Sequence, residues 1–493
     1  MKNQPTSERE ALDHLLTRLV GRASSAGNTL TLLRDSREHE AATLALIAQA
    51  NHTIALENYL IDDDDWGRSL LSALCQAAER GVRVAVLCDW LGSWRLSRHW
   101  RNTLINAGGE CRRFNVPGWG EPLAWVIRNH RKLLVTDSHT ALITGWCHSA
   151  RWRGQPATSA ETATLPWRDT GVRIQGPVAA EAETAFAQTW ALAGGNTWPS
   201  TAINSDKPLS SDDGSSRVRL IVGQPQSSPL FRLDQLMISQ AKYRLWLTDA
   251  YPVGTPAYLD GLRRAAQAGV DVRLLVPGSS DLPWLGLLAR SGYRALLEAG
   301  VRVFEWNGPM LHAKTAVIDG HWARVGSSNL NPASWLGNYE LDVAIECAGF
   351  GAQMETQFLT DLDSATEIVL RPDQSVHLAQ PRRRQRRHMP HQQSAVSTIR
   401  VSRAMALAVR ESRRLGPADA TALMLLGLIG LSIALLAFWR PAWVAWPLAT
   451  ISAWVSVNLL RIAWRRYQFH RQSGRARHKP AREEKSAKNP EET

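Results

Sequence analysis

The chain has 493 residues, 44% of them hydrophobic and 21% charged, and a net charge of +12. This length and composition indicate a large folded protein with room for two sizeable cores. The five cysteines form no CxxC pair and have no other metal-ligand spacing. So few cysteines in so long a chain exclude a disulfide-framed secreted fold and favour a reducing compartment.

The N-terminal extension, residues 1–27, begins "MKNQPTSEREALDHLL". It lacks the apolar segment of a secretory signal, so we expect no export of the chain.

The first half, residues 28–204, opens with an apolar strand that ends near Glu57. A helix-periodic segment follows, and Gly81-Val82 then introduces a second strand. Strands that alternate with helices of this length predict βαβ units and a mostly parallel sheet. Five tryptophans lie between these strands and the next motif: Trp90, Trp94, Trp100, Trp119 and Trp125. Each taken singly favours ordinary core or loop packing, but as a group, beside the membrane anchor predicted below, they suggest a rim through which lipid enters.

The stretch "NHRKLLVTD" carries the first chemical motif. Side chains two apart on a strand point to the same face, so His130 and Lys132 would share one face. Asp137 lies at an odd offset from His130 and begins a turn signal. We therefore expect Asp137 to have a structural role, although it completes the motif.

A polar segment, residues 205–217, is the predicted linker to a second half, residues 218–380. The second half repeats the first: a strand ends near Asp249, a helix follows, and "LHAKTAVIDG" places His312, Lys314 and Asp319 at the same spacing. The chain is thus predicted to be an α/β protein with two halves related by a pseudo-twofold axis and flanked by helices.

Two such faces, brought together, would offer two imidazoles and two ammonium groups to one phosphodiester. The lysines would stabilise negative charge on the phosphate oxygens. One imidazole would attack phosphorus to form a phosphohistidine, and the other would protonate the leaving alkoxide. This chemistry requires neither metal nor cofactor. A carboxylate should hold the opposite nitrogen of the attacking ring, and Asp169 and Glu340 are the candidates.

The paired motifs resemble those of the phospholipase D superfamily, and "GSSN" with the later "NYE" is most similar to the bacterial cardiolipin synthases. The resemblance covers about two thirds of the chain. It implies that His130 is the nucleophile and His312 the acid and base. It also implies that Lys132, Lys314 and Asn329 contact phosphate, with Ser327 beside them, and that Asp169 and Glu340 support the histidines.

One position departs from the family pattern. Where the family has Gly-x-Asn after the first motif, this chain reads "ITGWCHSA", so either Cys147 or His148 replaces the asparagine. His148 could donate a hydrogen bond in its place, but we expect it to face solvent.

The C-terminal part predicts a membrane anchor. Residues 420–460 contain two long uncharged segments joined at Arg440-Pro441, which predict a transmembrane helical hairpin. A buried core hairpin is the alternative. A basic juxtamembrane segment, residues 381–419, precedes it and a basic tail, residues 461–493, follows. By the positive-inside rule, the catalytic region and the tail would lie on the cytoplasmic side of a bacterial inner membrane.

Taken with the membrane hairpin, the resemblance implies a phosphatidyltransferase that makes cardiolipin from two molecules of phosphatidylglycerol. Its partners would be phospholipid substrates, with phosphatidylethanolamine as a further candidate, and an anionic membrane surface; nucleic acid is the less favoured partner. The alternatives are a phosphodiesterase of the same superfamily, acting on lipid or nucleic acid, and a non-catalytic lipid-binding protein anchored in the membrane.

Overall fold

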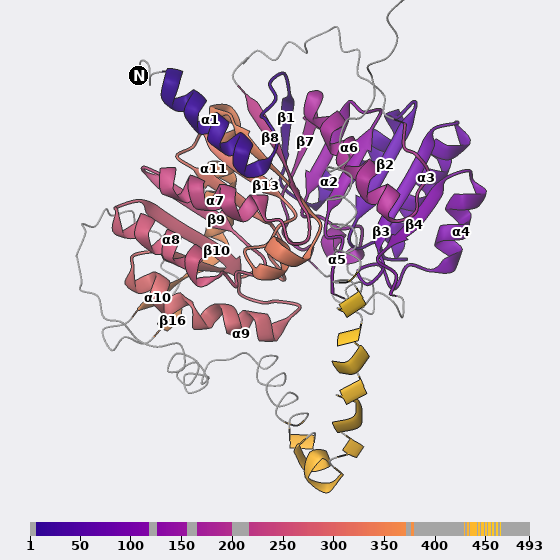
Figure 1. Cartoon of the computed structure of the whole chain (residues 1–493). Coiled ribbons are helices and arrows are strands. Elements are labelled where there is room, and N and C mark those ends of the chain that lie inside the picture. The colour runs from indigo at the N-terminus through magenta and orange to yellow at the C-terminus, as the bar shows by residue number, and fades with distance from the viewer. Residues whose placement is uncertain are drawn as a thin grey trace, which may run out of the picture. The chain divides into compact units, whose positions relative to one another are not determined.

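The computed structural model describes residues 6–117, 126–154, 165–199, 216–370 and 376–378, and scattered positions between 428 and 464 (Figure 1). The chain divides into two compact units. Both predicted halves, apart from residues 117–124, belong to the first unit, which spans Met1–Val116 and Trp125–Leu423.

The described part of the first half forms a seven-stranded sheet in the order β1-β7-β6-β5-β2-β3-β4. The strands are β1 (Thr29–Leu33), β2 (Thr53–Asn58), β3 (Arg83–Asp89), β4 (Glu110–Phe114), β5 (Lys132–Thr136), β6 (Thr140–Thr144) and β7 (Gly171–Gln175). Its helices are α2 (Ser36–Gln49), α3 (Asp65–Glu79), α4 (Arg98–Asn106), α5 (Ala150–Arg153) and α6 (Pro177–Leu192).

The described part of the second half forms a nine-stranded sheet in the order β16-β15-β11-β10-β9-β12-β13-β14-β8. The strands are β8 (Arg217–Gly223), β9 (Arg244–Thr248), β10 (Asp271–Pro277), β11 (Arg302–Trp306), β12 (Thr315–Ile318), β13 (Trp322–Gly326), β14 (Glu340–Glu346), β15 (Ala365–Leu370) and β16 (Val376–Leu378). Its helices are α7 (Pro229–Gln240), α8 (Pro256–Gln267), α9 (Pro283–Ser291), α10 (Tyr293–Glu298), the π-helical turn η2 (Ala333–Gly337) and α11 (Ala348–Asp363).

The prediction of mostly parallel sheets is wrong. Only β2-β3-β4 and β9-β10-β11 run parallel, and the other neighbouring strands in both sheets are antiparallel. The reason is that each motif strand turns straight back on itself. Asp137 and Ser138 have φ of 52° and 53°, and Asp319 and Gly320 have φ of 52° and 69°. Two consecutive residues in the left-handed region favour a tight antiparallel hairpin.

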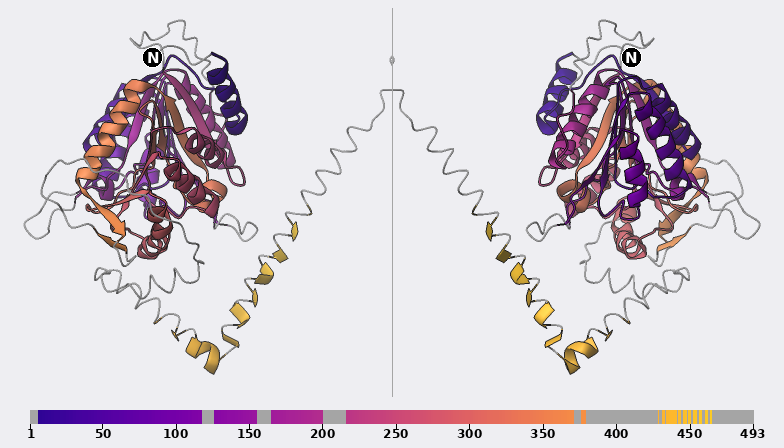
Figure 2. Two further views of the ribbon diagram at one scale, coloured as in Figure 1. Left: turned by 90° about the vertical axis from the view of Figure 1, so that its left-hand side faces the viewer. Right: turned by 90° about the vertical axis from the view of Figure 1, so that its right-hand side faces the viewer.

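The two halves share one hydrophobic core. A single cluster of buried side chains includes Phe186 and Trp190 of α6 and Phe350 and Phe358 of α11. Figure 2 shows the strands in the middle of the molecule with helices on both outer faces. The halves therefore pack as one body, which keeps the loops at their junction in a constant arrangement.

The N-terminal extension carries α1 (Thr6–Val20), which packs on the second half. Leu16 joins the cluster that holds Leu233 and Met237 of α7, and Asp13 pairs with Arg219 of β8. The N-terminal extension up to residue 27 therefore lies outside the first sheet, but its helix α1 is part of the folded core.

The predicted membrane segments lie largely outside the described residues, as do most of the linker, the basic juxtamembrane segment and all of the tail beyond Trp464. The described positions between Leu428 and Trp464 are helical, apart from Arg440. Among the residues that the structure describes, no helix has the length and apolar character needed to cross a bilayer.

Candidate active site

Both motif histidines lie at the junction of the two halves. His130 and His312 stand just before β5 and β12. The backbone N–H of His130 donates to Tyr339 O at 2.8 Å, and the N–H of His312 donates to Arg168 O at 2.7 Å. Each histidine is thereby bound to a residue of the opposite half. That residue directly precedes, in the sequence, one of the two carboxylates predicted to support a histidine ring.

The side chains repeat this crossed arrangement. Nδ1 of His130 contacts Glu340 Oε2 at 3.0 Å, and Nδ1 of His312 contacts Asp169 Oδ2 at 2.7 Å. A carboxylate can only accept, so each Nδ1 carries the hydrogen and each Nε2 keeps its lone pair. The Nζ of Lys314 also lies 2.9 Å from Nδ1 of His312. We assign the hydrogen bond to Asp169, because one Nδ1–H cannot donate and accept at once.

The two lysines sit beneath the histidines and are fully buried. Lys132 Nζ donates to His130 O at 2.7 Å, and Lys314 Nζ donates to His312 O. An ammonium group has three N–H donors, so each lysine keeps donors that an anionic ligand could meet. In addition to the larger effect of burial, the charge of Lys314 lowers the pKa of His130 and that of Lys132 lowers the pKa of His312. We refer to these four groups at the junction of the halves as the cluster.

Burial sets the protonation states in this cluster. It lowers the pKa of His130, against the opposing effect of Glu340, and lowers the pKa of His312 to about 3. It also lowers the pKa of Lys314 to about 8 and that of Lys132 below its usual value. Burial alone would raise the pKa of Glu340, but His130, Lys132 and Ser327 outweigh it and lower that pKa. The site thus holds neutral imidazoles beside ionised carboxylates at neutral pH.

Ser327 and Asn329 follow β13 into the same cluster. Ser327 Oγ donates to Glu340 Oε2 at 2.6 Å, so it orients the carboxylate that orients His130. Asn329 is buried, and its Oδ1 has no hydrogen-bond partner among the described residues. A buried polar atom without a protein partner is suited to meet a ligand.

The two motif aspartates lie at the far ends of their strands from the histidines. The Asp137 carboxylate accepts backbone N–H groups of Asn51, His52 and Thr53 at 2.9, 2.8 and 2.8 Å. Asp319 does the same for residues 242–244, at 2.9, 2.8 and 2.7 Å. Each aspartate therefore ties its hairpin turn to the start of the neighbouring strand in the sheet, β2 or β9.

The hairpin register decides which residue stands in place of the missing asparagine. Thr136 pairs with Thr140 as Ile318 pairs with Trp322, so Cys147 occupies the position that Asn329 has in the second half. Cys147 is buried, which raises its pKa to about 11, while Lys132 and Lys314 act in the opposite direction.

The expectation that His148 faces solvent is wrong. The chain turns inward after β6, because His148 N donates to Leu60 O at 3.1 Å. The ring lies 6.0 Å from Trp66 and 5.3 Å from Trp146, and burial lowers its pKa to about 3. His148 is therefore a neutral core residue.

Several site residues have no signal in the motif spacing. Rings of Tyr59 and Trp152 lie 4.9 Å from His130 and His312 respectively. Trp152 Nε1 also donates to Asp169 Oδ2 at 2.9 Å. Arg168 binds Asp361 of α11 through two hydrogen bonds of 2.9 and 2.7 Å, which clamps the loop of Asp169 onto the second half. Their positions depend on which loops the fold brings together.

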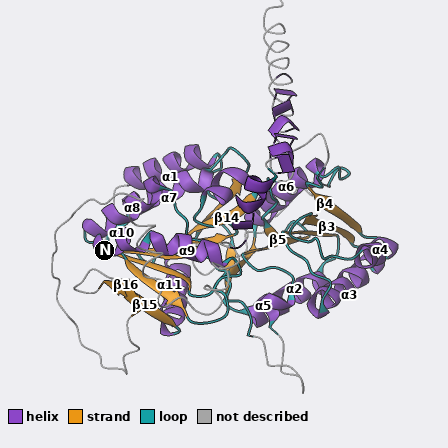
Figure 3. Ribbon diagram, turned by 90° about the horizontal axis from the view of Figure 1, so that it is seen from below, coloured by secondary structure: helices purple, strands orange, loops and turns teal. Residues whose placement is uncertain are grey.

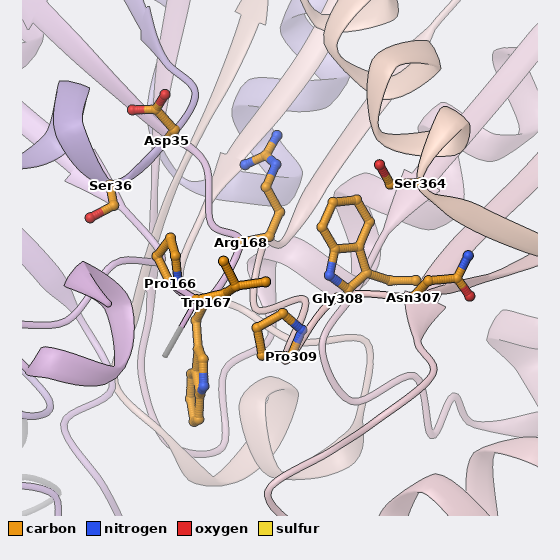
Figure 4. A pocket seen from close by; sticks show the side chains of 11 residues that line it. Asp35, Ser36, Pro166, Trp167, Arg168, Asn307, Gly308, Pro309 and Ser364 are labelled. Atoms are coloured by element: carbon orange, nitrogen blue, oxygen red, sulfur yellow. The ribbon is translucent and has the colours of Figure 1, made fainter. Parts of the chain in front are cut away.

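A cavity of about 500 Å³ adjoins the site on the other side of the loop that carries Asp169 (Figure 4). Its walls come from both halves, and they include Trp167, Arg168 and Pro309. The Trp167 ring lies 5.9 Å from the His312 ring, so it separates the cavity from the histidine. Among the described residues no group of three or more His, Cys, Asp and Glu is arranged to hold a metal ion.

The predicted lipid-entry rim is partly corrected. Trp100 is buried and donates from Nε1 to Gly67 O at 2.8 Å, so it is a core residue. Trp94 is exposed. Trp119 and Trp125 lie outside the described residues.

Known proteins are similar to this chain in sequence and in fold. A family model described as "Cardiolipin synthase, PLD-like domain" matches residues 43–152 and 236–362, which include both motifs. The chain is 32% identical to cardiolipin synthase A of Pseudomonas putida over 359 residues, covering 72% of this chain and 73% of that protein. The chain belongs to the cardiolipin synthase family of phospholipase D-like enzymes.

Other relatives agree with this membership. Cardiolipin synthase of Halalkalibacterium halodurans is 30% identical over 73% of this chain and 71% of its own length. The crystal structure of phosphatidylserine synthase from Haemophilus influenzae superposes with a TM-score of 0.58 at 16% identity, covering 72% of this chain and 92% of that one. That likeness shows the shared two-half fold. The predicted superfamily and the predicted class of phosphatidyltransferase are confirmed.

Proposed function

We propose that this member of the cardiolipin synthase family transfers a phosphatidyl group from one phosphatidylglycerol to another, giving cardiolipin and glycerol. The observation that carries the proposal is the crossed pairing of His130 with Glu340 and of His312 with Asp169. This pairing leaves the Nε2 atom of each ring without a carboxylate partner, at a junction where two ammonium groups are also buried. Such a site suits a reaction at one anionic phosphorus atom.

The first step forms a covalent intermediate. Nε2 of His130 bonds to phosphorus as the bond from phosphorus to the glycerol oxygen breaks. The leaving alkoxide takes a proton from Nε2 of His312 and departs as glycerol. In the empty site His312 has a pKa of about 3, so the anionic phosphodiester must help to stabilise its protonated form.

The second step reverses these roles. Nε2 of His312, now neutral, takes the proton of the acceptor hydroxyl. The acceptor oxygen bonds to phosphorus and the bond to His130 breaks, which restores the enzyme. Lys132, Lys314 and Asn329 would bind the phosphate oxygens in both steps.

The proposed setting is an anionic membrane. The substrates are lipids, and the uncharged segments within residues 420–460 would anchor the chain with its catalytic region on the cytoplasmic side. Phosphatidylethanolamine is a second candidate donor or acceptor.

The test combines a covalent trap with product analysis. Full-length protein in vesicles of phosphatidylglycerol labelled with ³²P in its phosphate should yield labelled cardiolipin and, after rapid quenching, a labelled protein adduct. His130→Ala should abolish both. Phosphatidic acid as the sole product would indicate a hydrolase, and nicking of plasmid DNA that requires His130 would indicate a nuclease. Absence of any adduct and any product would indicate a lipid-binding protein.

A further inference from the structure

The edge of the sheets that carries the site also carries exposed apolar side chains on both halves. The segments that follow β3 and β10 leave the sheets at this edge, because these strands run parallel to β2 and β9, whose last residues pair with the first residues of β5 and β12. After β3, Leu91 and Trp94 are exposed, and residue Trp94 is 65% accessible to solvent. After β10, Leu282, Trp284 and Leu288 are exposed on and before α9, with Trp284 at 52%.

Helix α9 packs weakly against the rest of the described chain. Ala289 alone of its nine residues is buried. The helix is nevertheless held at both ends. Asp281, just before it, accepts a hydrogen bond of 2.7 Å from Tyr251, and Arg290 donates to Gly278 O at 3.0 Å and to Glu305 at 2.7 Å. A fixed helix thus presents Trp284 and Leu288 outward, and it faces the viewer in Figure 3.

The loop after β3 is fixed in the same way. Asp89 accepts the N–H groups of Leu91 and Gly92 at 2.9 and 3.0 Å and also that of Asn129, the residue before His130, at 2.9 Å. A Cβ at Gly92 would lie 2.2 Å from Tyr59 O, so only glycine allows this close approach. The exposed tip at Leu91 and Trp94 is therefore built onto the residues that position His130.

Both tips connect directly to the catalytic cluster through a tyrosine. The Tyr59 ring, under the first tip, lies 4.9 Å from the His130 ring, and the Tyr251 ring, joined to the second tip, lies 6.2 Å from the His312 ring. The apolar tips thus flank the site on both sides. Exposed tryptophan beside exposed basic side chains suits the interface of an anionic bilayer, and Arg95 stacks on Trp94 at 5.2 Å with Arg98 close by in sequence.

We propose that the segment from Leu91 to Trp94 and helix α9 form a two-part docking surface that inserts into an anionic phospholipid bilayer and turns the catalytic site toward the lipid headgroups. The proposal rests on the proposed function for its choice of partner, because a site that acts on phospholipid phosphates must meet them at the bilayer surface. A second copy of the chain and a protein partner are the competing occupants of this surface.

The first test measures insertion without turnover. Full-length protein is placed in phosphatidylglycerol vesicles that contain a phospholipid with a photoactivated diazirine in its acyl chain, and labelled peptides are identified by mass spectrometry. Peptides with Leu91 to Trp94 and with Trp284 to Leu288 should be labelled. Tyr243, which is 69% exposed at the opposite end of β9, should not. Labelling of Tyr243 and absence of labelling on both tips would overturn the proposal.

The second test separates docking from chemistry. Trp284→Glu/Leu288→Glu should lower the turnover of vesicle phosphatidylglycerol by about tenfold or more, since membrane affinity scales with the apolar area inserted. It should leave the turnover of a short-chain, monomerically dissolved phosphatidylglycerol unchanged within about twofold, the spread we allow because exposed substitutions seldom disturb a fold. Leu91→Glu/Trp94→Glu should behave alike, and Tyr243→Glu is the matched control.

The outcomes distinguish the two proposals. Equal losses on both substrates would contradict the docking surface. A wild-type protein that turns over neither substrate but labels at both tips would contradict the proposed function and keep the docking surface. If α9 is protected from labelling to a degree that depends on protein concentration and not on lipid, the surface belongs to a contact with a second copy of the chain.

Discussion

At the scale of single residues, Glu340 and Asp169 determine which nitrogen of each motif histidine keeps its lone pair. The carboxylates hold Nδ1–H of His130 and His312 at 3.0 and 2.7 Å, so the lone pair of each ring is on Nε2. Glu340 also raises the pKa of His130 against the larger effect of burial. Its removal would therefore affect both the orientation of the ring and its titration.

We expect Glu340→Gln to lower kcat by about 100-fold to 1,000-fold, as loss of acid-base positioning does in other enzymes. The pKa of His130 should fall further, because the group that raises it is gone. The neutral, nucleophilic ring then persists to lower pH, and the acid limb of the profile of kcat/KM against pH should move to lower pH. Glu346→Gln, at the other end of β14, is the control. A reduced kcat with an unmoved acid limb would show that Glu340 does not tune His130.

Lys314 gives the profile an alkaline limb. Burial lowers its pKa to about 8, so its positive charge is present below that pH and is lost above it. We expect kcat/KM, which reports the free enzyme, to fall as pH rises through about 8. In the profile of kcat against pH, the alkaline limb should lie at higher pH than in the profile of kcat/KM, because bound phosphate stabilises the ammonium ion. Rates measured between about pH 6 and about pH 10 check this, and a kcat/KM that stays constant throughout would contradict it.

The residues of the motifs could be found from their spacing, but which carboxylate each histidine would contact could not. The alternation along a strand correctly put His130 beside Lys132 and set Asp137 apart from them. Asp169 and Glu340 were also identified. That each would serve the histidine of the opposite half depends on how the loops meet in space, which local pattern does not contain. The inward turn of His148 likewise depends on the backbone of Leu60.

At the scale of elements, the hairpins explain what the motif aspartates do. Each carboxylate accepts three backbone N–H groups at the start of the neighbouring strand. The apolar runs correctly predicted strands, and Asp-Ser and Asp-Gly correctly predicted turns. The direction of neighbouring strands was mispredicted, because a strand's own sequence shows its faces but not its partners.

We expect Asp137→Asn to lower the free energy of unfolding by about 2 kcal/mol, the usual scale for lost hydrogen bonds to a charged group. Asparagine tolerates the positive φ of this turn, so the hairpin itself should form. Denaturant unfolding measures the loss, and kcat per folded molecule should stay within about threefold of wild type, as expected for a residue away from the reacting groups. A loss of kcat comparable to that of His130→Ala would instead make Asp137 catalytic.

At the scale of the whole molecule, the halves depend on one another for both core and chemistry. Buried side chains of α6 and α11 belong to one cluster, and each histidine lacks its carboxylate until the other half is present. The internal repeat made the two halves predictable from sequence. The extent of their shared core was not, because the residues concerned are ordinary apolar positions in both halves.

We expect a chain divided between residues 204 and 205 to be active only when both fragments are produced together. Either fragment alone should form no labelled phosphohistidine, since residues 1–204 lack Glu340 and residues 205–493 lack both His130 and Asp169. Co-purification of the fragments and recovery of product measure the reassembly. Adduct formation at the wild-type rate by residues 1–204 alone would show that the crossed carboxylate is dispensable.

The crossed arrangement also bears on how such a protein could have arisen. If the repeat records a gene duplication, the ancestor encoded a single half, whose histidine would have found its carboxylate only on a twin molecule. That ancestor would have worked as a homodimer with two identical sites merged into one. Fusion of the two copies then allowed each half to diverge. Cys147 and Asn329 occupy equivalent positions in the two halves, and their difference marks where the inherited symmetry has been lost.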